Sequence, residues 1–386
     1  MENYYSRYDW ETMLNANAPG QYSIAEYHKI LSPQWPDFLD RYLELPMLQR
    51  LKGVGLLCGT DWTTLYKNRF YYSRLDHSVG VALIIWNFTK DKAQTLAGLL
   101  HDVSTPVFSH VSDFRKGDAL TQTATEEDNL SILRSNKELA RLLQEDGLSV
   151  EQVEDYHKYP VADNEIPQLS ADRLEYMYPS GMALDGSWTL DTIKQTYRNL
   201  RVLKNENGID ELGFTDTGIA LEYCRHFCMI GHILQLNENK LTLYMLGQIM
   251  NRAVELGVLH EDDFMKKSER EIMEKLEEFV ALRQAQGPQT KAQGQQFRVQ
   301  GPQDDLARLY QTFRTMTHIE HTDTPLPADQ YFCVSLKVKQ RYINPLVGNG
   351  KRLYDCSAQA RTLIDDFLSY TDTRYGCVRL VNSTKH

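Results

Sequence analysis

The sequence predicts a largely helical protein with a small α+β region at its C-terminal end. Apolar residues recur at helical spacing in residues 189–204, 216–236, 241–257 and 262–283, and two more helical patterns lie within residues 74–101. The end of the chain differs. There Val334, Leu336 and Val338 alternate with polar residues, which predicts a half-buried strand.

Composition shifts divide the chain into four parts. Residues 1–44 are rich in Tyr and Trp and broken by proline, so we expect an irregular lead-in with one or two helical turns. Residues 45–282 form the main helical domain. Residues 283–304 repeat Gln, Gly and Pro and are expected to be a low-complexity flexible insertion. Residues 305–386 make the C-terminal α+β region, with a helix around Leu363–Leu368 and a last strand at 375–381.

Charge and composition restrict the possible partners. The 386 residues carry a net charge of −10, which argues against a general nucleic-acid coat because such proteins are normally basic. No apolar run approaches the ~20 residues that span a bilayer, so no membrane partner is expected. The first residues do not resemble a signal peptide and the six cysteines are dispersed, so we expect free thiols in the cytoplasm.

Two of the helical patterns end in residues that an apolar face does not need. The first stripe, Gly80 to Ile85, is continued at its N-terminal end by His77, and the second, Ala93 to Leu100, is followed by His101 and then Asp102. Helices that pack against each other would carry these side chains inward. A buried carboxylate is costly unless it is paired or bound to a metal. A divalent cation is the simplest group that satisfies all three.

The spaced pattern H…HD…D, formed by His77, His101, Asp102 and the later Asp172, resembles the HD superfamily of metal-dependent phosphohydrolases. Residues 46–55, the R-x-x-H that ends at His77, and residues 101–110 and 171–176 resemble its deoxynucleoside triphosphate triphosphohydrolase (dNTPase) branch. The resemblance covers roughly residues 40–260. It implies an all-α HD-domain fold, a homo-oligomer, and a metal-bound hydroxide that attacks the phosphorus of a (deoxy)nucleoside triphosphate.

The resemblance also assigns roles to individual residues. The four residues of the pattern would bind one divalent ion, and their mixed nitrogen and oxygen donors leave Mn, Mg, Fe, Zn and Ni open. His110 would protonate the leaving oxygen with Asp113 orienting it. Phosphate and sugar would be contacted by Arg74, Arg173 and Tyr176.

The sequence departs from the branch at three places. Thr105 stands where the branch has a histidine, residues 125–128 (TEED) replace another histidine, and Leu56 replaces a sugar-reading glutamine. Glu126 is the candidate substitute acid–base group. These departures keep two alternatives open: a nucleotidase or phosphodiesterase that acts on another phosphate ester, and a non-catalytic nucleotide-sensing protein.

A basic cluster near the C-terminal end also has two interpretations. Lys337, Lys339 and Arg341 alternate along the predicted strand. By resemblance they would bind a regulatory nucleotide at a subunit boundary. As an ordinary feature they would form a solvated strand face, which is the commoner arrangement.

Overall fold

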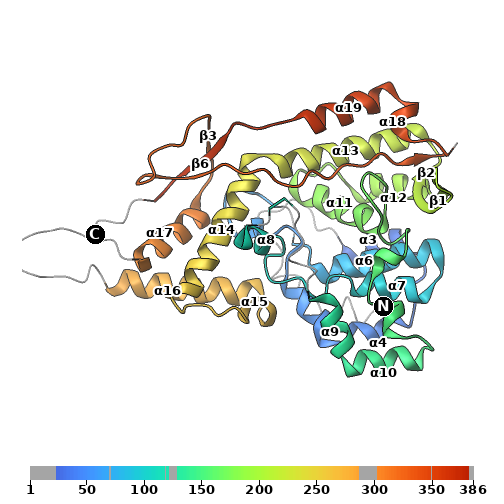
Figure 1. Cartoon of the computed structure of the whole chain (residues 1–386), viewed down its shortest axis with the longest axis horizontal. Helices are drawn as coiled ribbons and strands as arrows, with labels where there is room; N and C mark the ends of the chain where they lie inside the picture. The colour runs from blue at the N-terminus through green and yellow to red at the C-terminus, as the bar shows by residue number, and fades with distance from the viewer. Residues whose placement is uncertain are drawn as a thin grey trace, which may run out of the picture.

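The computed structural model describes residues 23–68, 71–117, 119–120, 128–286, 302–348 and 350–381. Most of them are helical, as predicted (Figure 1). The α-helices are α3 (Ile24–Leu31), α4 (Leu39–Leu43), α5 (Pro46–Gln49), α6 (Arg74–Thr89), α7 (Lys92–Leu100), α8 (Val111–Lys116), α9 (Asn129–Ser135), α10 (Lys137–Glu145), α11 (Ala171–Leu184), α12 (Leu190–Arg198), α13 (Thr217–Gln235), α14 (Asn237–Glu255), α15 (Asp263–Lys266), α16 (Glu269–Gln286), α17 (Pro302–Thr315), α18 (Leu353–Cys356) and α19 (Ala358–Ser369).

Short 3₁₀ helices connect some of these elements: η1 (Arg50–Gly53), η2 (Thr60–Trp62), η3 (Val150–Gln152) and η4 (Tyr156–Lys158). Two helix N-caps that the sequence predicts are present in the structure. Ser149 and Gln152 form the capping box of η3, and the Ser170 hydroxyl accepts the backbone N–H of Arg173 at the start of α11.

Two small three-stranded sheets accompany the helices. One has the order β1 (Leu200–Lys204), β2 (Asp210–Phe214), β5 (Leu346–Val347), and the other has the order β3 (Glu320–Thr322), β6 (Tyr375–Arg379), β4 (Tyr331–Val334). The second sheet and α19 agree with the predicted C-terminal α+β region. The first sheet joins distant parts of the chain, because Gly213 and Phe214 of β2 pair in parallel with Leu346 and Val347.

The predicted helix over 189–204 is wrong beyond α12. Residues 200–204 instead pair antiparallel with β2 from Leu200↔Phe214 to Lys204↔Asp210. The turn between the strands explains the difference: the Asn205 side chain accepts the N–H groups of Asn207 and Ile209, and Gly208 takes a positive φ of 74°. Leu200 therefore begins a strand and does not continue the helix, and only its pairing with β2 shows this.

The predicted strand around Val334–Val338 is shorter than expected. It ends at Val334, and residues 335–345 have no regular secondary structure. The predicted insertion is also shorter at both edges, because α16 continues through Gln286 and α17 begins at Pro302. The remainder of that insertion, 287–301, lies outside the described residues, as does most of the lead-in.

The expectation of free thiols is wrong for two of the six cysteines. Cys333 on β4 and Cys377 on β6 are directly opposed in the sheet and form a disulfide. Local sequence patterns do not indicate this pair, because the two residues are 44 positions apart. Cys58, Cys224, Cys228 and Cys356 are free thiols.

Helix α6 is the central element of the core. Its residues from Arg74 to Ile85 are all buried, and a capping box between Ser73 and Asp76 starts the helix. Helices α3, α7 and α11 pack against it. Glycine permits two close approaches: a Cβ at Gly98 of α7 would lie 3.2 Å from Val81, and one at Gly80 would lie 2.7 Å from Glu175 of α11.

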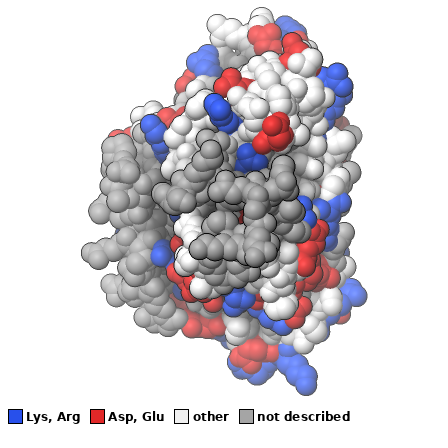
Figure 2. All heavy atoms as spheres, turned by 90° about the vertical axis from the view of Figure 1, so that its left-hand side faces the viewer, with Lys and Arg blue, Asp and Glu red and all other residues white. Residues whose placement is uncertain are grey.

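The C-terminal chain runs along one long side of the molecule and packs on this helical core (Figure 1). Helix α19 lies on α13, and the sheet β3-β6-β4 contacts α14. In the described part of the chain, no helix has both the length and the apolar character needed to cross a membrane. On the face in Figure 2, basic and acidic side chains of the described residues are interspersed.

Candidate metal centre

The structure brings the four predicted ligands together from three elements. His77 lies in the first turn of α6, His101 and Asp102 follow the last turn of α7, and Asp172 lies in the first turn of α11. The Nε2 atom of His77 is 3.1 Å from an Asp172 oxygen and 3.9 Å from an Asp102 oxygen. The corresponding distances from His101 Nε2 are 3.8 Å and 3.7 Å.

Both imidazoles are held by their other ring nitrogen. His77 Nδ1 is 2.5 Å from the Glu175 carboxylate, and His101 Nδ1 is 2.7 Å from the carbonyl oxygen of Gly98. Each interaction leaves Nε2 directed at the carboxylates of Asp102 and Asp172. A second partner that fixes the ring and its tautomer in this way is the usual environment of a metal-binding histidine.

Glu175 is a site residue that the sequence analysis missed. It is completely buried and accepts hydrogen bonds from Tyr72 Oη at 2.6 Å and Tyr27 Oη at 3.0 Å, besides its contact with His77. Its position three residues after Asp172 on one helix was the available signal, because both side chains then lie on the same face. Gly80 was a second signal for Glu175, because α11 can approach α6 closely only at a position that has no side chain.

The site has more acidic groups than its histidines can balance. Burial by itself lowers the pKa of His77, but hydrogen bonds and charges of Asp172 and Glu175 outweigh it and raise the pKa to about 10. Burial also opposes ionisation of Asp102, yet Arg74 and the two histidines hold the pKa of that carboxyl well below its usual range. Burial similarly opposes ionisation of Asp172, whose pKa is kept low by His77 and His101. Two ionised carboxylates and a buried His77–Glu175 pair therefore share one small volume.

This donor set fits a divalent cation. Ligand atoms of His77, His101 and Asp102 all lie within 4.8 Å of one another, and Asp172 adds a second carboxylate beside both rings. Imidazole nitrogens and carboxylate oxygens suit Mn, Fe, Zn, Ni or Mg, so the geometry supports one divalent metal without selecting it. Thr105, at the position of an absent histidine, donates to Asp102 Oδ1 at 2.8 Å and helps to orient this ligand.

A second group with metal-ligand atoms lies outside this centre. Glu238, His321 and Asp372 are partly exposed, and both ring nitrogens of His321 already contact carboxylates, at 2.9 Å and 3.1 Å. That arrangement is an ion-paired bridge between α14 and the C-terminal sheet. The buried centre at His77 differs because its Nε2 atoms converge on two carboxylates.

Arg74 lies beside the ligands but contacts protein groups. Its Nη1 is 3.0 Å from Asp102, and its Nε donates to Ser109 Oγ at 3.0 Å. Arg50, which was not predicted, donates to the carbonyl oxygens of Val103 and Thr105 and holds the loop after Asp102. Both arginines thus fix the loop that carries Asp102.

His110 and Asp113 form the predicted pair. His110 Nδ1 is 2.9 Å from the Asp113 carboxylate, which is fully buried, so the Nε2 side of the ring is available to the cavity. The preceding turn has unusual backbone geometry, with φ of 61° at Phe108 and 50° at Ser109. Non-glycine residues in this region carry strain and occur often at functional sites. Burial lowers the pKa of His110, and the hydrogen bond to Asp113 raises it. Burial is the larger effect, so the pKa stays below its usual range.

The remaining predicted residues are placed differently. Tyr176 lines the cavity, and its buried hydroxyl has no hydrogen-bond partner among the described residues. Arg173 does not line the cavity. Its guanidinium donates to the carbonyl oxygens of Gln168 and Asn164, so it secures the loop before α11 and is not presented to a phosphate. Glu126 lies outside the described residues.

The four ligands open onto a cavity of about 210 Å³. Part of the lining is apolar and aromatic, and the Tyr156 ring of η4 lies tilted against His101 with a ring-centre distance of 4.8 Å. The lining also includes basic residues, two of them from the C-terminal region. The lining includes Tyr156, Tyr176, Phe114, Phe227, Lys339 and Arg341.

Comparisons with known proteins agree with this geometry. No family model matches the chain. The chain is 24% identical over 270 residues to the metal-dependent phosphohydrolase cns2 of Cordyceps militaris, an alignment that covers 69% of this chain and 75% of that protein. It is also 30% identical over 142 residues to the uncharacterized protein YdhJ of Bacillus subtilis, covering 36% of this chain and 41% of that one.

Solved structures show that the fold occurs elsewhere. A phosphohydrolase from Bacteroides thetaiotaomicron matches with a TM-score of 0.55 and 13% identity, over 95% of this chain and 97% of that one. A hypothetical protein from Aquifex aeolicus matches with a TM-score of 0.50 and 17% identity, over 90% and 93%. At these identities the likeness concerns the fold, and it extends through the C-terminal region.

Proposed function

We propose that the protein is an HD-type metal-dependent phosphohydrolase that acts on nucleotides. The observation that carries the proposal is the convergence of His77, His101, Asp102 and Asp172 at the end of one cavity. The similarity to a metal-dependent phosphohydrolase over most of both chains supports the same reaction class. When bound at these residues, a divalent ion supplies a water of lowered pKa and neutralises phosphate oxygens.

The residues of the chain divide the remaining work. Glu175 and the Gly98 carbonyl orient the two imidazoles, and Arg74 orients Asp102. His110 is positioned to give a proton to the leaving oxygen, because its Nδ1 is held by the buried Asp113. The hydrogen bond to Asp113 opposes the lowering of the His110 pKa by burial and so favours the protonated ring that this step needs.

The cavity wall supports a nucleotide as the organic part of the substrate. Tyr156, Tyr176, Phe114 and Phe227 provide flat and apolar surfaces that a base and sugar can contact. The Tyr176 hydroxyl, which has no hydrogen-bond partner in the described part of the chain, can give a hydrogen bond to a sugar or phosphate oxygen. Within this class we favour a (deoxy)nucleoside triphosphate, by resemblance to the dNTPase branch. The cytoplasmic location and the homo-oligomeric state expected from the sequence stay predictions.

A product assay tests the reaction class. Metal-loaded protein is incubated with nucleoside mono-, di-, tri- and cyclic phosphates, and orthophosphate, pyrophosphate and tripolyphosphate are separated. The proposal predicts turnover of at least one nucleotide and its loss in His101→Ala, whereas His260→Ala, which changes an exposed histidine, retains it. Tripolyphosphate identifies the dNTPase-like reaction, and orthophosphate from monophosphates alone selects the nucleotidase. Undiminished activity in His101→Ala would refute the assignment.

A further inference from the structure

Residues 335–345, here called the strap, connect β4 to β5 and pass beside the metal centre. The strap has no regular secondary structure, but both of its ends are fixed. At the first end the Cys333–Cys377 disulfide ties β4 to β6, and at the other end Leu346 and Val347 pair with β2. The two sheets therefore hold the ends of the strap.

Contacts along the strap hold it against the helices that carry the site. The Gln235 side chain at the end of α13 donates to the carbonyl oxygen of Lys339 at 3.0 Å. Ile343 is fully buried, and the Asn344 N–H donates to the carbonyl oxygen of Pro167 at 2.7 Å, in the loop just before α11. These bonds hold the middle of the strap against the end of α13 and the loop before α11.

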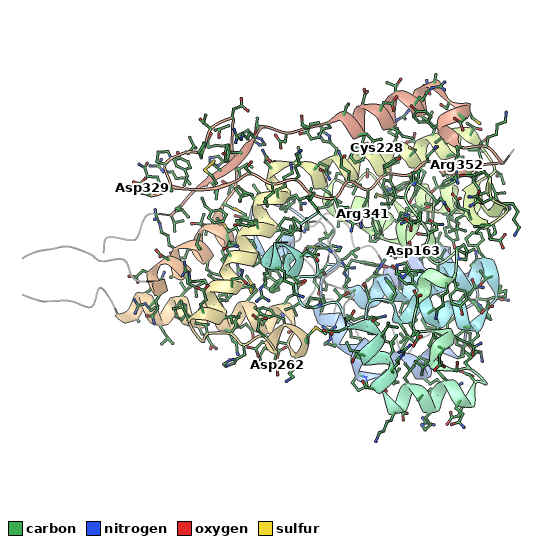
Figure 3. The ribbon with its side chains drawn as sticks, viewed as in Figure 1. Asp163, Cys228, Asp262, Asp329, Arg341 and Arg352 are labelled. Atoms are coloured by element: carbon green, nitrogen blue, oxygen red, sulfur yellow. A yellow bond between two sulfur atoms is a disulfide. The ribbon has the colours of Figure 1, made fainter. Side chains whose placement is uncertain are left out.

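Two basic residues of the strap line the same cavity as the metal ligands. Lys339 and Arg341 are partly buried there, together with His110 and Tyr176. In an extended chain residues two positions apart share a face, so both side chains reach the same wall. Figure 3 labels Arg341 near the middle of the molecule, beside the helices of the core. Lys337, two positions earlier, is exposed and does not line the cavity.

The positive charge of Arg341 acts on two other side chains of the cavity. Burial has the largest effect on the pKa of both His110 and Tyr176, but Arg341 lowers each of them, as a nearby positive charge does. The cavity lining thus combines the acidic groups of the metal centre with two cations of the strap, Lys339 and Arg341, here called the basic wall. Two cations thus line the cavity of a chain whose net charge is −10, and among the described residues the Tyr176 hydroxyl in the same cavity has no hydrogen-bond partner.

We propose that Lys339 and Arg341 bind a second anionic group of the substrate, at a distance from the phosphorus that is attacked at the metal centre. The inference rests on the proposed phosphohydrolase function and assigns the residues that bind the part of the substrate away from the attacked phosphorus. The substrate class is a phosphate ester with at least one further phosphate, because two cations in the cavity lining favour a second anionic group. The C-terminal region is then part of the active site and is not an appendage to it.

Binding of inorganic probes tests this inference without turnover. Orthophosphate and pyrophosphate are titrated calorimetrically into metal-loaded protein at a fixed, buffered free Mn²⁺ concentration. Wild-type protein is expected to prefer pyrophosphate, and Lys339→Gln and Arg341→Gln each reduce this preference about tenfold or more, because a charge-assisted hydrogen bond is lost. Metal content and orthophosphate affinity stay unchanged.

Two further variants separate charge from structure. Lys337→Gln removes an exposed cation from the same strap and is expected to bind pyrophosphate like the wild type. Arg341→Lys retains the charge and recovers most of the preference. Wild-type pyrophosphate affinity in both Gln variants would overturn the inference, and so would equal losses of metal, orthophosphate and pyrophosphate, which mark a structural role.

The two proposals fail in different ways. Arg341-dependent pyrophosphate binding without turnover of any nucleotide supports the basic wall and contradicts the phosphohydrolase assignment. Nucleotide turnover with the same kcat and KM in wild type, Lys339→Gln and Arg341→Gln supports the assignment and contradicts the role of the strap.

Discussion

Replacing Glu175 with glutamine tests whether the buried carboxylate prepares His77 for metal binding. Glu175 Oε2 lies 2.5 Å from His77 Nδ1, while Oε1 accepts from Tyr27 and Tyr72. Glutamine has the same shape and keeps an acceptor oxygen, but it has no charge. The Tyr72 hydroxyl lies 3.3 Å from His28 Nε2 as well, so it has another partner when the new amide N–H₂ points at it. Folding is therefore expected to survive.

The size of the effect follows from the lost charge. A neutral amide polarises the imidazole less than a carboxylate, so Nε2 becomes a weaker ligand. Loss of such a supporting group usually reduces metal affinity about 10–100-fold, which corresponds to about 1.4–2.7 kcal/mol. In the metal-free protein, the pKa of His77 also falls from about 10, because Glu175 is one of the two groups that raise it.

Calorimetric titration of metal-stripped protein with Mn²⁺ measures the affinity, and NMR titration of the His77 ring measures its pKa. Tyr27→Phe is the matched control, because it removes a hydrogen bond to Oε1 and leaves the contact of Oε2 with His77. That variant should lose about 1 kcal/mol of folding stability and keep its metal affinity within about threefold. Wild-type Mn²⁺ affinity in Glu175→Gln would refute the role given to Glu175.

Three other perturbations follow from the same geometry. Gly80→Ala places a methyl group 2.7 Å from Glu175 Cδ, so thermal unfolding should show a loss of about 1–3 kcal/mol together with weaker Mn²⁺ binding; an unchanged Tm would contradict the close approach of α6 and α11. His110→Gln should lower kcat about 10²–10⁴-fold with metal content intact, as measured by initial rates and elemental analysis; loss of metal instead would make His110 a ligand. Burial opposes protonation of His321, but Glu238 and Asp372 raise its pKa above the unfolded value of about 6.5. Its contribution to stability is therefore full below about pH 6.5 and is lost as the pH rises through the raised pKa, so the stability difference between wild type and His321→Ala in urea unfolding should shrink from pH 6 to pH 9. A difference that grows with pH would contradict the bridge.

The sequence was most informative where one local pattern determines one element. The apolar stripes of α6 and α7 end in His77 and His101, so packing of these helices places both imidazoles in the interior. The N-cap at Ser170 begins α11 one residue before the turn that contains Asp172. Such features depend on residues within four or five positions of each other, which is the range that periodicity and capping report.

Long-range pairing was not accessible in the same way. Leu200–Lys204 has the composition of a helix end but becomes a strand because β2 pairs with it. The alternating pattern of the strap predicts a continued strand. Its path is set instead by a disulfide and by a loop 177 positions earlier, where the carbonyl oxygen of Pro167 accepts the Asn344 N–H. The resemblance assigns Arg173 to a phosphate contact, but its guanidinium donates to the loop before α11. Basic residues of the strap are therefore part of the cavity, which alternation alone could not indicate.

The central claim is that His77, His101, Asp102 and Asp172 bind one divalent ion, and calorimetric titration of metal-stripped protein with Mn²⁺ tests it most directly. The predicted result is one ion per chain in the wild type and in His321→Ala, with binding abolished in His101→Ala and in Asp102→Asn. Binding that persists in the latter two variants and disappears in His321→Ala would place the ion at the other acidic cluster and contradict the account.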